Sequence, residues 1–266
     1  MTARPKVCAI VQARMGSQRL PGKVLAAIDR APMLAHVVER AAACAAVDQV
    51  VIATGDGADD DPIAVVARSL GVSCWRGSRH DVLARYRGAA DASGADVVVR
   101  LTADCPLLDP AVIGDVVAAL VDGPDPCDYA SNTFVRTFPR GLDAEACWID
   151  TLHRLDRLAR APHHREHVTA LVHDRPDWFV TASVEGPVDA SDLRLTVDTE
   201  ADLELVRLIH ARLAPSPTTP HAAIVALLRR EPALVAINAA VEQRSWHHAE
   251  RAAERAAERG VEVGHA

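Results

Sequence analysis

A twelve-residue segment, QARMGSQRLPGK, concentrates positive charge and glycine near the start of the chain. Arg14, Arg19 and Lys23 fall within residues 12–23, together with two glycines and Ser17. Glycine lets backbone N–H groups approach an anion closely, and the three cations could neutralise a triphosphate. The spacing fits neither a Walker loop nor the G-x-G-x-x-G fingerprint. The segment predicts a phosphate-binding loop of another kind, and a polar surface loop is the alternative.

Two aspartates stand where predicted strands end. Asp104 occurs in RLTADCPL, residues 100–107, and Asp198 in RLTVDT, residues 194–199. A carboxylate in this position could hold Mg²⁺ against phosphate oxygens, because Mg²⁺ prefers a few protein oxygens together with substrate oxygens. The alternatives are a turn or helix cap at Asp104 and an N-cap at Asp198. If both strands belong to one sheet, the two side chains could share one metal ion.

Two polar clusters are weaker candidates. In RGSRHD, residues 76–81, Ser78 or Asp81 could cap the following helix. In HHREH, His163 and His167 share a helical face that could suit zinc. A metalloprotease is excluded because His164 stands where HExxH requires glutamate. We interpret His163 and His164 as exposed residues at a helix start.

The first half of the chain alternates short apolar runs with helical periodicity. This alternation predicts a parallel sheet covered by helices on both faces, with ligands at the carboxyl ends of its strands. The predicted strands are 7–11, 49–54, 72–75 and 96–101. The predicted helices are 33–45, 62–70, 81–92 and 110–120.

The second half is less regular. It predicts strands at 128–133, 143–148, 179–184 and 193–197, and helices at 149–158, 164–173 and 200–213. We expect a single domain over residues 1–240, in which about 128–185 form an inserted subregion. Residues 241–266 are rich in alanine and charge, which is typical of a polar terminal helix or tail.

Composition narrows the classes of function. The net charge of −7 and the 3% aromatic content argue against a nucleic-acid partner. The six cysteines show no C-x-x-C spacing, so neither a zinc ribbon nor a redox dithiol is indicated. We expect neither a signal peptide nor a membrane-spanning segment, and therefore a cytoplasmic protein without a membrane partner.

Five segments in order resemble the cytidylyltransferase family of spore-coat polysaccharide biosynthesis. They are QARMGSQRLPGKVL, RLTADCPLLDP, YASNTFVRTFPRGLDAEA, REHVT and LRLTVDTEADLELV. That family is similar to the cytidylyltransferases for acylneuraminate and 3-deoxy-manno-octulosonate. The resemblance runs from about Lys6 to about Asn238. One departure concerns the GD-x-P motif of the latter enzymes, which here reads Ala103-Asp104-Cys105-Pro106, so the acceptor need not be an eight- or nine-carbon keto acid.

The resemblance implies a fold, a reaction and a set of site residues. The fold is the Rossmann-like nucleotide-diphospho-sugar transferase fold, with a mostly parallel central sheet and an inserted subregion that builds a homodimer. The reaction is Mg²⁺-dependent transfer of CMP from CTP to a sugar or sugar acid, with catalytic roles for Arg14, Lys23, Asp104 and Asp198 and both aspartates as metal ligands. Nucleotide contacts are implied for Gln12, Ala13, Gly16, Ser17, Arg19, Arg79, Arg100 and Thr102. Acceptor contacts are implied for Asn132, Arg140, Asp143, Glu145 and His167.

The expected mechanism is direct in-line attack by the acceptor hydroxyl on the α-phosphorus, without a covalent enzyme intermediate. Three alternatives stay open. They are a phosphonate or other small polar acceptor, a different nucleoside triphosphate, and a catalytically silent nucleotide-binding regulator on the same fold.

Overall fold

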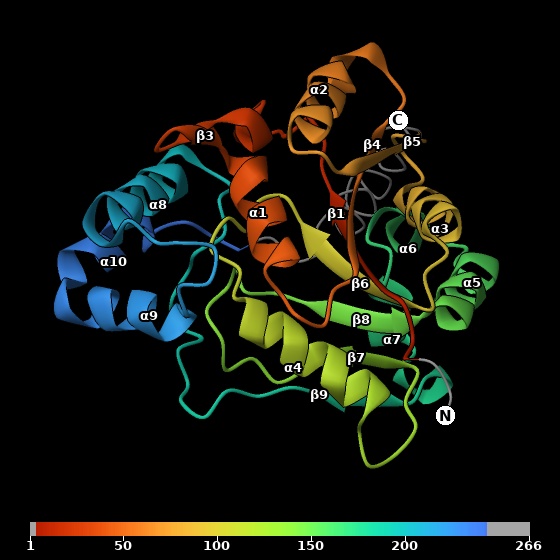
Figure 1. The fold of residues 1–266 in the computed structure, drawn as a ribbon. Coiled ribbons are helices and arrows are strands. Elements are labelled where there is room, and N and C mark those ends of the chain that lie inside the picture. Colours follow the sequence, from red (N-terminus) through yellow and green to blue (C-terminus); the bar gives the residue numbers. More distant parts are fainter. Residues whose placement is uncertain (1–3, 244–266) are drawn as a thin grey trace, which may run out of the picture.

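The computed structural model describes residues 4–243 and contains a seven-stranded sheet in the order β5-β4-β1-β6-β8-β7-β9 (Figure 1). Four neighbouring strands form its parallel half: β1 (Val7–Gln12), β4 (Gln49–Gly55), β5 (Ser73–Gly77) and β6 (Val97–Thr102). Residues 7–11 of β1 are buried on both faces, as expected of a central parallel strand. The predicted parallel sheet is confirmed.

Three further strands extend this sheet beyond β6. β8 (Glu145–Trp148) is antiparallel to β6, β7 (Tyr129–Ser131) is antiparallel to β8, and β9 (Thr181–Ser183) is parallel to β7. The predicted strand at 193–197 is wrong. That segment makes only an isolated bridge between Arg194 and Arg140 and no continuous ladder.

Helices cover both faces of the sheet. One face packs against α1 (Met33–Ala42), α2 (Asp61–Ser69) and α4 (Pro110–Val121). The other face packs against α3 (Val82–Ser93), α5 (Ile149–Leu158) and α7 (Ala170–Asp174). A third apolar cluster, at the left in Figure 1, joins α8 (Glu200–Leu213), α9 (His221–Arg230) and α10 (Pro232–Asn238) to the 193–197 segment. Helices α9 and α10 were not predicted.

The predicted helix at 164–173 is also wrong. Two short helices replace it, α6 (Pro162–Glu166) and α7, with Val168 between them at a φ of 57°. A β-branched residue adopts this left-handed conformation only when its surroundings enforce it. Here Val168 is buried and the next residue, Thr169, donates a hydrogen bond from its hydroxyl to Glu145 in β8. Tertiary contacts therefore break the helix.

The remaining elements are short. They are the 3₁₀ helices η1 (Lys23–Leu25), η2 (Ala58–Asp60) and η3 (Pro176–Trp178), and a hairpin of β2 (Ala27–Ile28) and β3 (Ala31–Pro32). Among residues 4–243, no helix is both long and apolar enough to cross a bilayer. Most of the predicted polar tail, from residue 244 onward, lies outside the described residues.

The strand order places a topological switch point between β1 and β6. From β1 the chain proceeds outward through β4 to β5, and then returns to the other side of β1 with β6. Open α/β sheets bind ligands in the crevice beyond the strand ends at such a point. Gln12 and Thr102, the last residues of β1 and β6, are register partners there.

Candidate functional site

Lys23 joins the two strand-end aspartates beyond β1 and β6. Its Nζ atom lies 2.9 Å from Oδ2 of Asp104 and 2.8 Å from Oδ1 of Asp198, and it also donates to the carbonyl of Val197 at 2.7 Å. The two carboxylates, 94 residues apart in the sequence, therefore meet around one point. Lys23 is buried, and burial alone lowers its pKa, but the charges of Asp104 and Asp198 outweigh burial and raise it.

Asp198 is the most heavily paired carboxylate of the site. Its Oδ2 atom lies 2.8 Å from Nη2 of Arg19 and 2.8 Å from Nη2 of Arg194. Burial raises the pKa of Asp198, but the Lys23 ammonium and the two guanidinium groups more than offset this and lower it. Arg194 in turn contacts Asp202, with Nε 2.9 Å from Oδ1. These contacts hold Asp198 ionised and fixed in orientation.

Neither aspartate serves as a helix cap. Thr199 caps α8: its hydroxyl accepts from the amide of Asp202, whose carboxylate accepts from the amide of Thr199. The cap of α4 is Asp109, which accepts from the amide of Ala111 at 2.9 Å. The capping alternatives for Asp104 and Asp198 are therefore wrong, whereas Asp104 does lie in a turn.

Backbone contacts hold the segment that carries Asp198 against the turn that carries Asp104. The amide of Val197 donates to the carbonyl of Asp104 at 2.8 Å, and the Thr196 hydroxyl donates to the same carbonyl at 3.3 Å. Leu195 and Val197 are buried in the cluster around α8. Packing and two local hydrogen bonds therefore position Asp198 where the predicted strand ladder is missing.

The loop between β1 and Lys23 folds around a single carbonyl. The Met15 carbonyl accepts from the amides of Ser17 and Gly22, both at 2.9 Å, and the Met15 amide donates to Oδ1 of Asp60 at 2.7 Å. Gly22 adopts a φ of 71°, which turns the chain into η1 and brings Lys23 inward. The loop thus directs Lys23 to the aspartates and leaves Gly16 at the surface.

Arg79 lies directly over Gly16. A Cβ atom built on Gly16 would be only 2.4 Å from Nη2 of Arg79, so glycine is what permits this approach. Among the described residues, Arg79 forms one ion pair, an exposed contact of 3.6 Å between its Nη1 atom and Oδ2 of Asp59. In the same segment Asp81 caps α3 by accepting from the amide of Ala84 at 2.9 Å. The structure thus combines a cap at Asp81 with a cation beside the loop.

A cavity of about 90 Å³ lies beside the end of β1. Its lining comprises Gln12, Ala13, Arg14, Val82, Arg85, Glu166 and His167. Oε1 of Gln12 is buried and accepts no hydrogen bond from residues 4–243, so a ligand donor could satisfy it. Burial lowers the pKa of His167, although Glu166 opposes this effect. Arg14 stands half exposed at the rim, 3.4 Å from Glu166.

The residues expected to contact an acceptor lie in different surroundings. Asn132 is 0% exposed, and its amide group bridges the carbonyl of Leu142 at 2.8 Å and the amide of Ala144 at 2.9 Å. Glu145 is 7% exposed and pairs with Arg100, a predicted nucleotide contact. Both side chains thus make structural contacts inside the protein, and their predicted ligand contacts stay predictions.

Asp143 and Arg140 lie nearer to the surface. Two parallel bonds link Asp143 to Arg136, with Oδ1 2.6 Å from Nη1 and Oδ2 2.9 Å from Nη2. Arg140 is partly exposed, and its backbone pairs with Leu193 and Leu195 beside the segment that leads to Asp198. These two residues and Arg136 therefore lie at the flank of the site, and the predicted acceptor contacts of Asp143 and Arg140 stay predictions.

Several site residues escaped sequence reasoning. Arg85 and Glu166 line the cavity, while Arg136, Arg194 and Asp202 orient predicted residues. The one local signal was the spacing of Arg194, Asp198 and Asp202 at four-residue intervals across the start of a predicted helix. The other contacts join residues far apart in the sequence.

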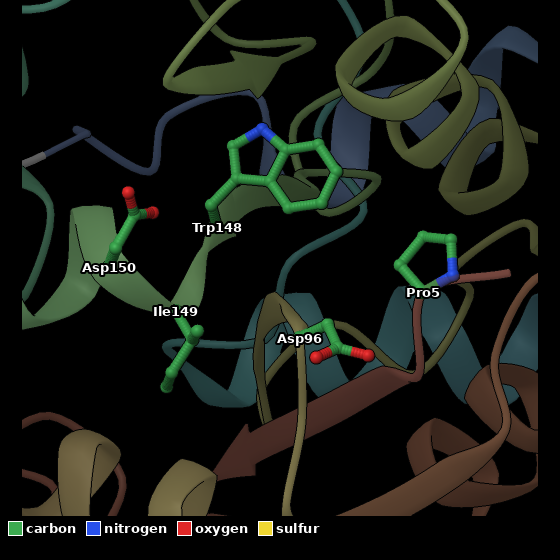
Figure 2. Close-up of a pocket in the computed structure, with 5 residues that line it drawn as sticks. All are labelled: Pro5, Asp96, Trp148, Ile149 and Asp150. Atoms are coloured by element: carbon green, nitrogen blue, oxygen red, sulfur yellow. The ribbon is translucent and has the colours of Figure 1, made fainter. Parts of the chain in front are cut away.

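A larger open depression, of about 560 Å³, lies at the opposite edge of the sheet (Figure 2). Pro5 and Asp96 lie at the amino ends of β1 and β6, and Trp148, Ile149 and Asp150 complete its lining. Figure 2 shows two carboxylates and no cationic side chain among these five residues. An anionic ligand therefore finds no cation in this depression, whereas Lys23 and Arg19 lie at the edge of the sheet that carries the proposed site.

The Lys23 cluster suits a small divalent cation. Asp104 and Asp198 each bring a carboxylate oxygen within 2.9 Å of the same ammonium nitrogen, so a cation already occupies the point between them. Carboxylate oxygens are the donors that Mg²⁺ takes together with substrate phosphates. The donor set therefore fits Mg²⁺, on the condition that Lys23 leaves the point between the two carboxylates.

A family comparison agrees with this geometry. Residues 8–204 match the model of the family described as "Cytidylyltransferase". The spore coat polysaccharide biosynthesis protein SpsF of Bacillus subtilis is 32% identical over 230 residues, covering 84% of this chain and 94% of that protein. The 3-deoxy-manno-octulosonate cytidylyltransferase of Geobacter sulfurreducens is 41% identical over 120 residues, 44% of this chain and 46% of that enzyme.

A solved structure extends the similarity to three dimensions. A cytidylyltransferase from Leptospira borgpetersenii superimposes with a TM-score of 0.83 at 32% identity, covering 87% of this chain and 97% of that one. The overall fold of this chain is thus similar to that of a protein named as a cytidylyltransferase.

Proposed function

This chain belongs to the cytidylyltransferase family, and we propose that it transfers CMP from CTP to a hydroxyl of a sugar or sugar acid, with Mg²⁺ and release of pyrophosphate. The observation that carries the proposal is the contact of Lys23 with both Asp104 and Asp198 at the switch point of the sheet. A cationic loop, two carboxylates and a crevice beyond parallel strands are the parts that nucleotidyl transfer needs.

The reaction we propose is a direct displacement. The acceptor oxygen forms a bond to the α-phosphorus, the bond from that phosphorus to the bridging oxygen breaks, and pyrophosphate leaves with the bonding electrons. Asp104 and Asp198 would hold Mg²⁺, whose positive charge would polarise the phosphate and favour loss of the hydroxyl proton to solvent water. Lys23, Arg19 and Arg14 bind the phosphates and offset the charge of the leaving group.

Other residues of the chain fix the geometry of this site. Arg194 and Asp202 hold Asp198 in one orientation, which limits reorganisation during the reaction. Gln12 offers the base or ribose of CTP an acceptor, because its Oε1 has no hydrogen-bond donor within residues 4–243. Arg79 approaches a phosphate across Gly16, where the chain leaves room for it.

For the acceptor we propose a sugar or sugar acid of surface polysaccharide synthesis. Two names support this class: the Bacillus subtilis relative is a spore coat polysaccharide biosynthesis protein, and the Geobacter relative acts on 3-deoxy-manno-octulosonate. The Arg136–Asp143 pair and Arg140 at the flank of the site are suited to hydroxyl and carboxylate groups. We also propose a homodimer formed through residues 128–185.

A pyrophosphate-release screen tests the proposal. CTP, UTP, ATP and GTP are each combined with a panel of sugars, sugar acids and phosphonates, with Mg²⁺ present. We expect release only with CTP and a sugar-type acceptor. Asp104→Asn should lower this turnover at least about a hundredfold, whereas Asp192→Asn, which alters an exposed pair with Arg229, should not change it.

Two outcomes would count against the proposal. Tight CTP binding without release in any combination would identify a silent regulator. Undiminished turnover in Asp104→Asn would remove that carboxylate from the reaction.

A further inference from the structure

Two consecutive histidines converge on one carboxylate oxygen at the end of α7. Nε2 of His163 lies 2.7 Å from Oδ2 of Asp174, and Nε2 of His164 lies 3.0 Å from the same atom. The two rings are 4.0 Å apart between centroids. Their side chains are only 10% and 13% exposed, so the expectation of exposed histidines is wrong.

This convergence requires an unusual arrangement of neighbours. Consecutive residues on a helix point about 100° apart, so adjacent side chains do not normally meet at one point. Here α6 has only five residues, and the turn at Val168 brings Asp174 back beside it. The chain thus gathers two imidazoles and one carboxylate in a partly buried place.

The three groups form a ligand set for a transition metal. Their nearest ligand atoms all lie within 4.8 Å of one another. In a tetrahedral zinc site with bonds of about 2.1 Å, ligand atoms stand roughly 3.4 Å apart, so a small outward movement would admit the ion. Imidazole nitrogen favours zinc, nickel or cobalt over Mg²⁺ and Ca²⁺, which take oxygen ligands.

We propose that His163, His164 and Asp174 bind Zn²⁺ or a similar divalent transition metal as a three-ligand site, separate from Asp104 and Asp198. The ion clips α6 to α7 across the turn at Val168. α6 also carries Glu166, which contacts Arg14 at 3.4 Å. Its C-cap, His167, lines the cavity. Metal occupancy therefore stabilises one rim of the proposed nucleotide site.

Zinc titration of the full chain without an affinity tag tests the site. Competition with a chromophoric chelator measures affinity and stoichiometry without any turnover, so the result does not depend on the proposed transferase activity. We expect one tight equivalent in the wild type and at least tenfold weaker binding in Asp174→Asn, because an amide keeps the shape but is a poor ligand. The variant Asp104→Asn, which alters the proposed transferase site, should still bind one equivalent of zinc tightly.

The pair of His153 and Asp91 provides a matched control. Its contact of 2.7 Å resembles that of His163 with Asp174, but the described residues add no second histidine. Asp91→Asn should leave zinc affinity unchanged. If Asp174→Asn fails to fold, His164→Gln replaces it as the deciding variant.

Thermal denaturation gives a second readout. One equivalent of zinc should raise the Tm of the wild type and of Asp91→Asn, and not that of Asp174→Asn. Equal zinc affinity in Asp174→Asn and the wild type, or no tight equivalent in the wild type, would overturn the proposal. The latter outcome would reduce the cluster to two imidazoles that hydrogen-bond to a carboxylate.

Discussion

The Nζ atom of Lys23 lies 2.8 Å from Oδ1 of Asp198, so a side-chain cation occupies the place proposed for the metal. Around it, Lys23, Arg19 and Arg194 balance the negative charges of Asp104, Asp198 and Asp202. A divalent ion that entered alone would meet a neutral cluster and would have to displace an ammonium. If the phosphates of CTP bind here as proposed, Lys23 gains another partner and can release the aspartates.

We therefore predict that metal and CTP bind cooperatively and that Lys23→Met weakens this coupling. Without CTP, the variant should bind Mg²⁺ at least about fivefold more tightly than the wild type, because no ammonium competes for the carboxylates; this corresponds to about 1 kcal/mol. Turnover should nevertheless fall about a hundredfold or more, since the phosphates lose a cation. Calorimetric titration with and without CTP measures the affinities.

Lys6, the other lysine of the chain, provides the control. Lys6 is exposed and donates to the Ser93 carbonyl near the opposite edge of the sheet. Lys6→Met should therefore leave both the Mg²⁺ affinity and the turnover unchanged. If Lys23→Met bound Mg²⁺ less tightly than the wild type in the absence of CTP, the idea of competition would be wrong.

A second prediction concerns the space between Gly16 and Arg79. Gly16→Ala places a methyl group only 2.4 Å from Nη2 of Arg79, so the Arg79 side chain must move away. Because Arg79 is exposed, its movement should leave the Tm nearly unchanged, whereas KM for CTP should rise about tenfold for the loss of one phosphate contact. Initial-rate kinetics and a melting curve provide the two measurements.

Gly57→Ala is the matched substitution. Within the described part of the chain, no atom lies within 4 Å of a Cβ built on Gly57, and its backbone suits any residue. Its KM should equal that of the wild type. An unaltered KM in Gly16→Ala would exclude Arg79 from CTP binding.

The parallel half of the fold was predictable because its signals are local. Residues 7–11 of the buried strand β1 are a continuous apolar run, and the intervening helices show 3.6-residue periodicity. The convergence of Asp104 and Asp198 was expected only if both followed strands of one sheet. The structure brings the two carboxylates together although residues 193–197 form no strand. The burial of Leu195 and Val197 fixes the course of this segment toward Asp104, as a strand would have done.

Other features depend on contacts between distant residues. No glycine or proline marks the break at Val168, which is enforced by packing and by the bond from Thr169 to Glu145. The pairing of His163 and His164 with Asp174 depends on that break. Helix α9, by contrast, had a readable signal: Pro220 precedes it, and Ile224, Leu227 and Leu228 recur at helical spacing.

A third prediction separates a structural from an acceptor-binding role for Glu145. The buried Glu145 carboxylate pairs with Arg100 and accepts a hydrogen bond of 2.7 Å from Tyr129. Glu145→Gln leaves Arg100 buried without its counter-ion, which should lower the free energy of unfolding at neutral pH by about 3–5 kcal/mol. Urea denaturation measures this loss.

The pH dependence of Glu145→Gln follows from the pKa of the carboxyl group. Burial raises that pKa, but the charge of Arg100 and the hydrogen bonds lower it below its usual value. The stabilisation is therefore present above about pH 4.3 and is lost as the pH falls further, so the difference between wild type and variant should shrink in acid. Exposed Glu185→Gln is the control. Normal stability with a raised KM for the acceptor would favour direct acceptor binding instead.

The last prediction concerns His210, a buried side chain outside the site. Burial lowers its pKa to about 4, the nearby charges of His36 and Arg40 act in the same direction, and Asp29 opposes them. The His210 ring stands edge-on to that of His36, 4.7 Å between centroids. Because the pKa in the folded protein lies below the unfolded value of about 6.5, protonation favours unfolding. Stability should be complete above pH 6.5 and decline as the pH falls toward 4.

His210→Phe keeps the ring contact and removes the titrating group. Between pH 7.5 and pH 5 the wild type should therefore lose about 2 kcal/mol more of its free energy of unfolding than the variant does. Urea denaturation at both pH values measures the difference. His80→Phe, at an exposed position, should show the pH dependence of the wild type. If the curves of His210→Phe and the wild type ran parallel, His210 would contribute nothing to acid sensitivity, and protonation elsewhere in the chain would account for it.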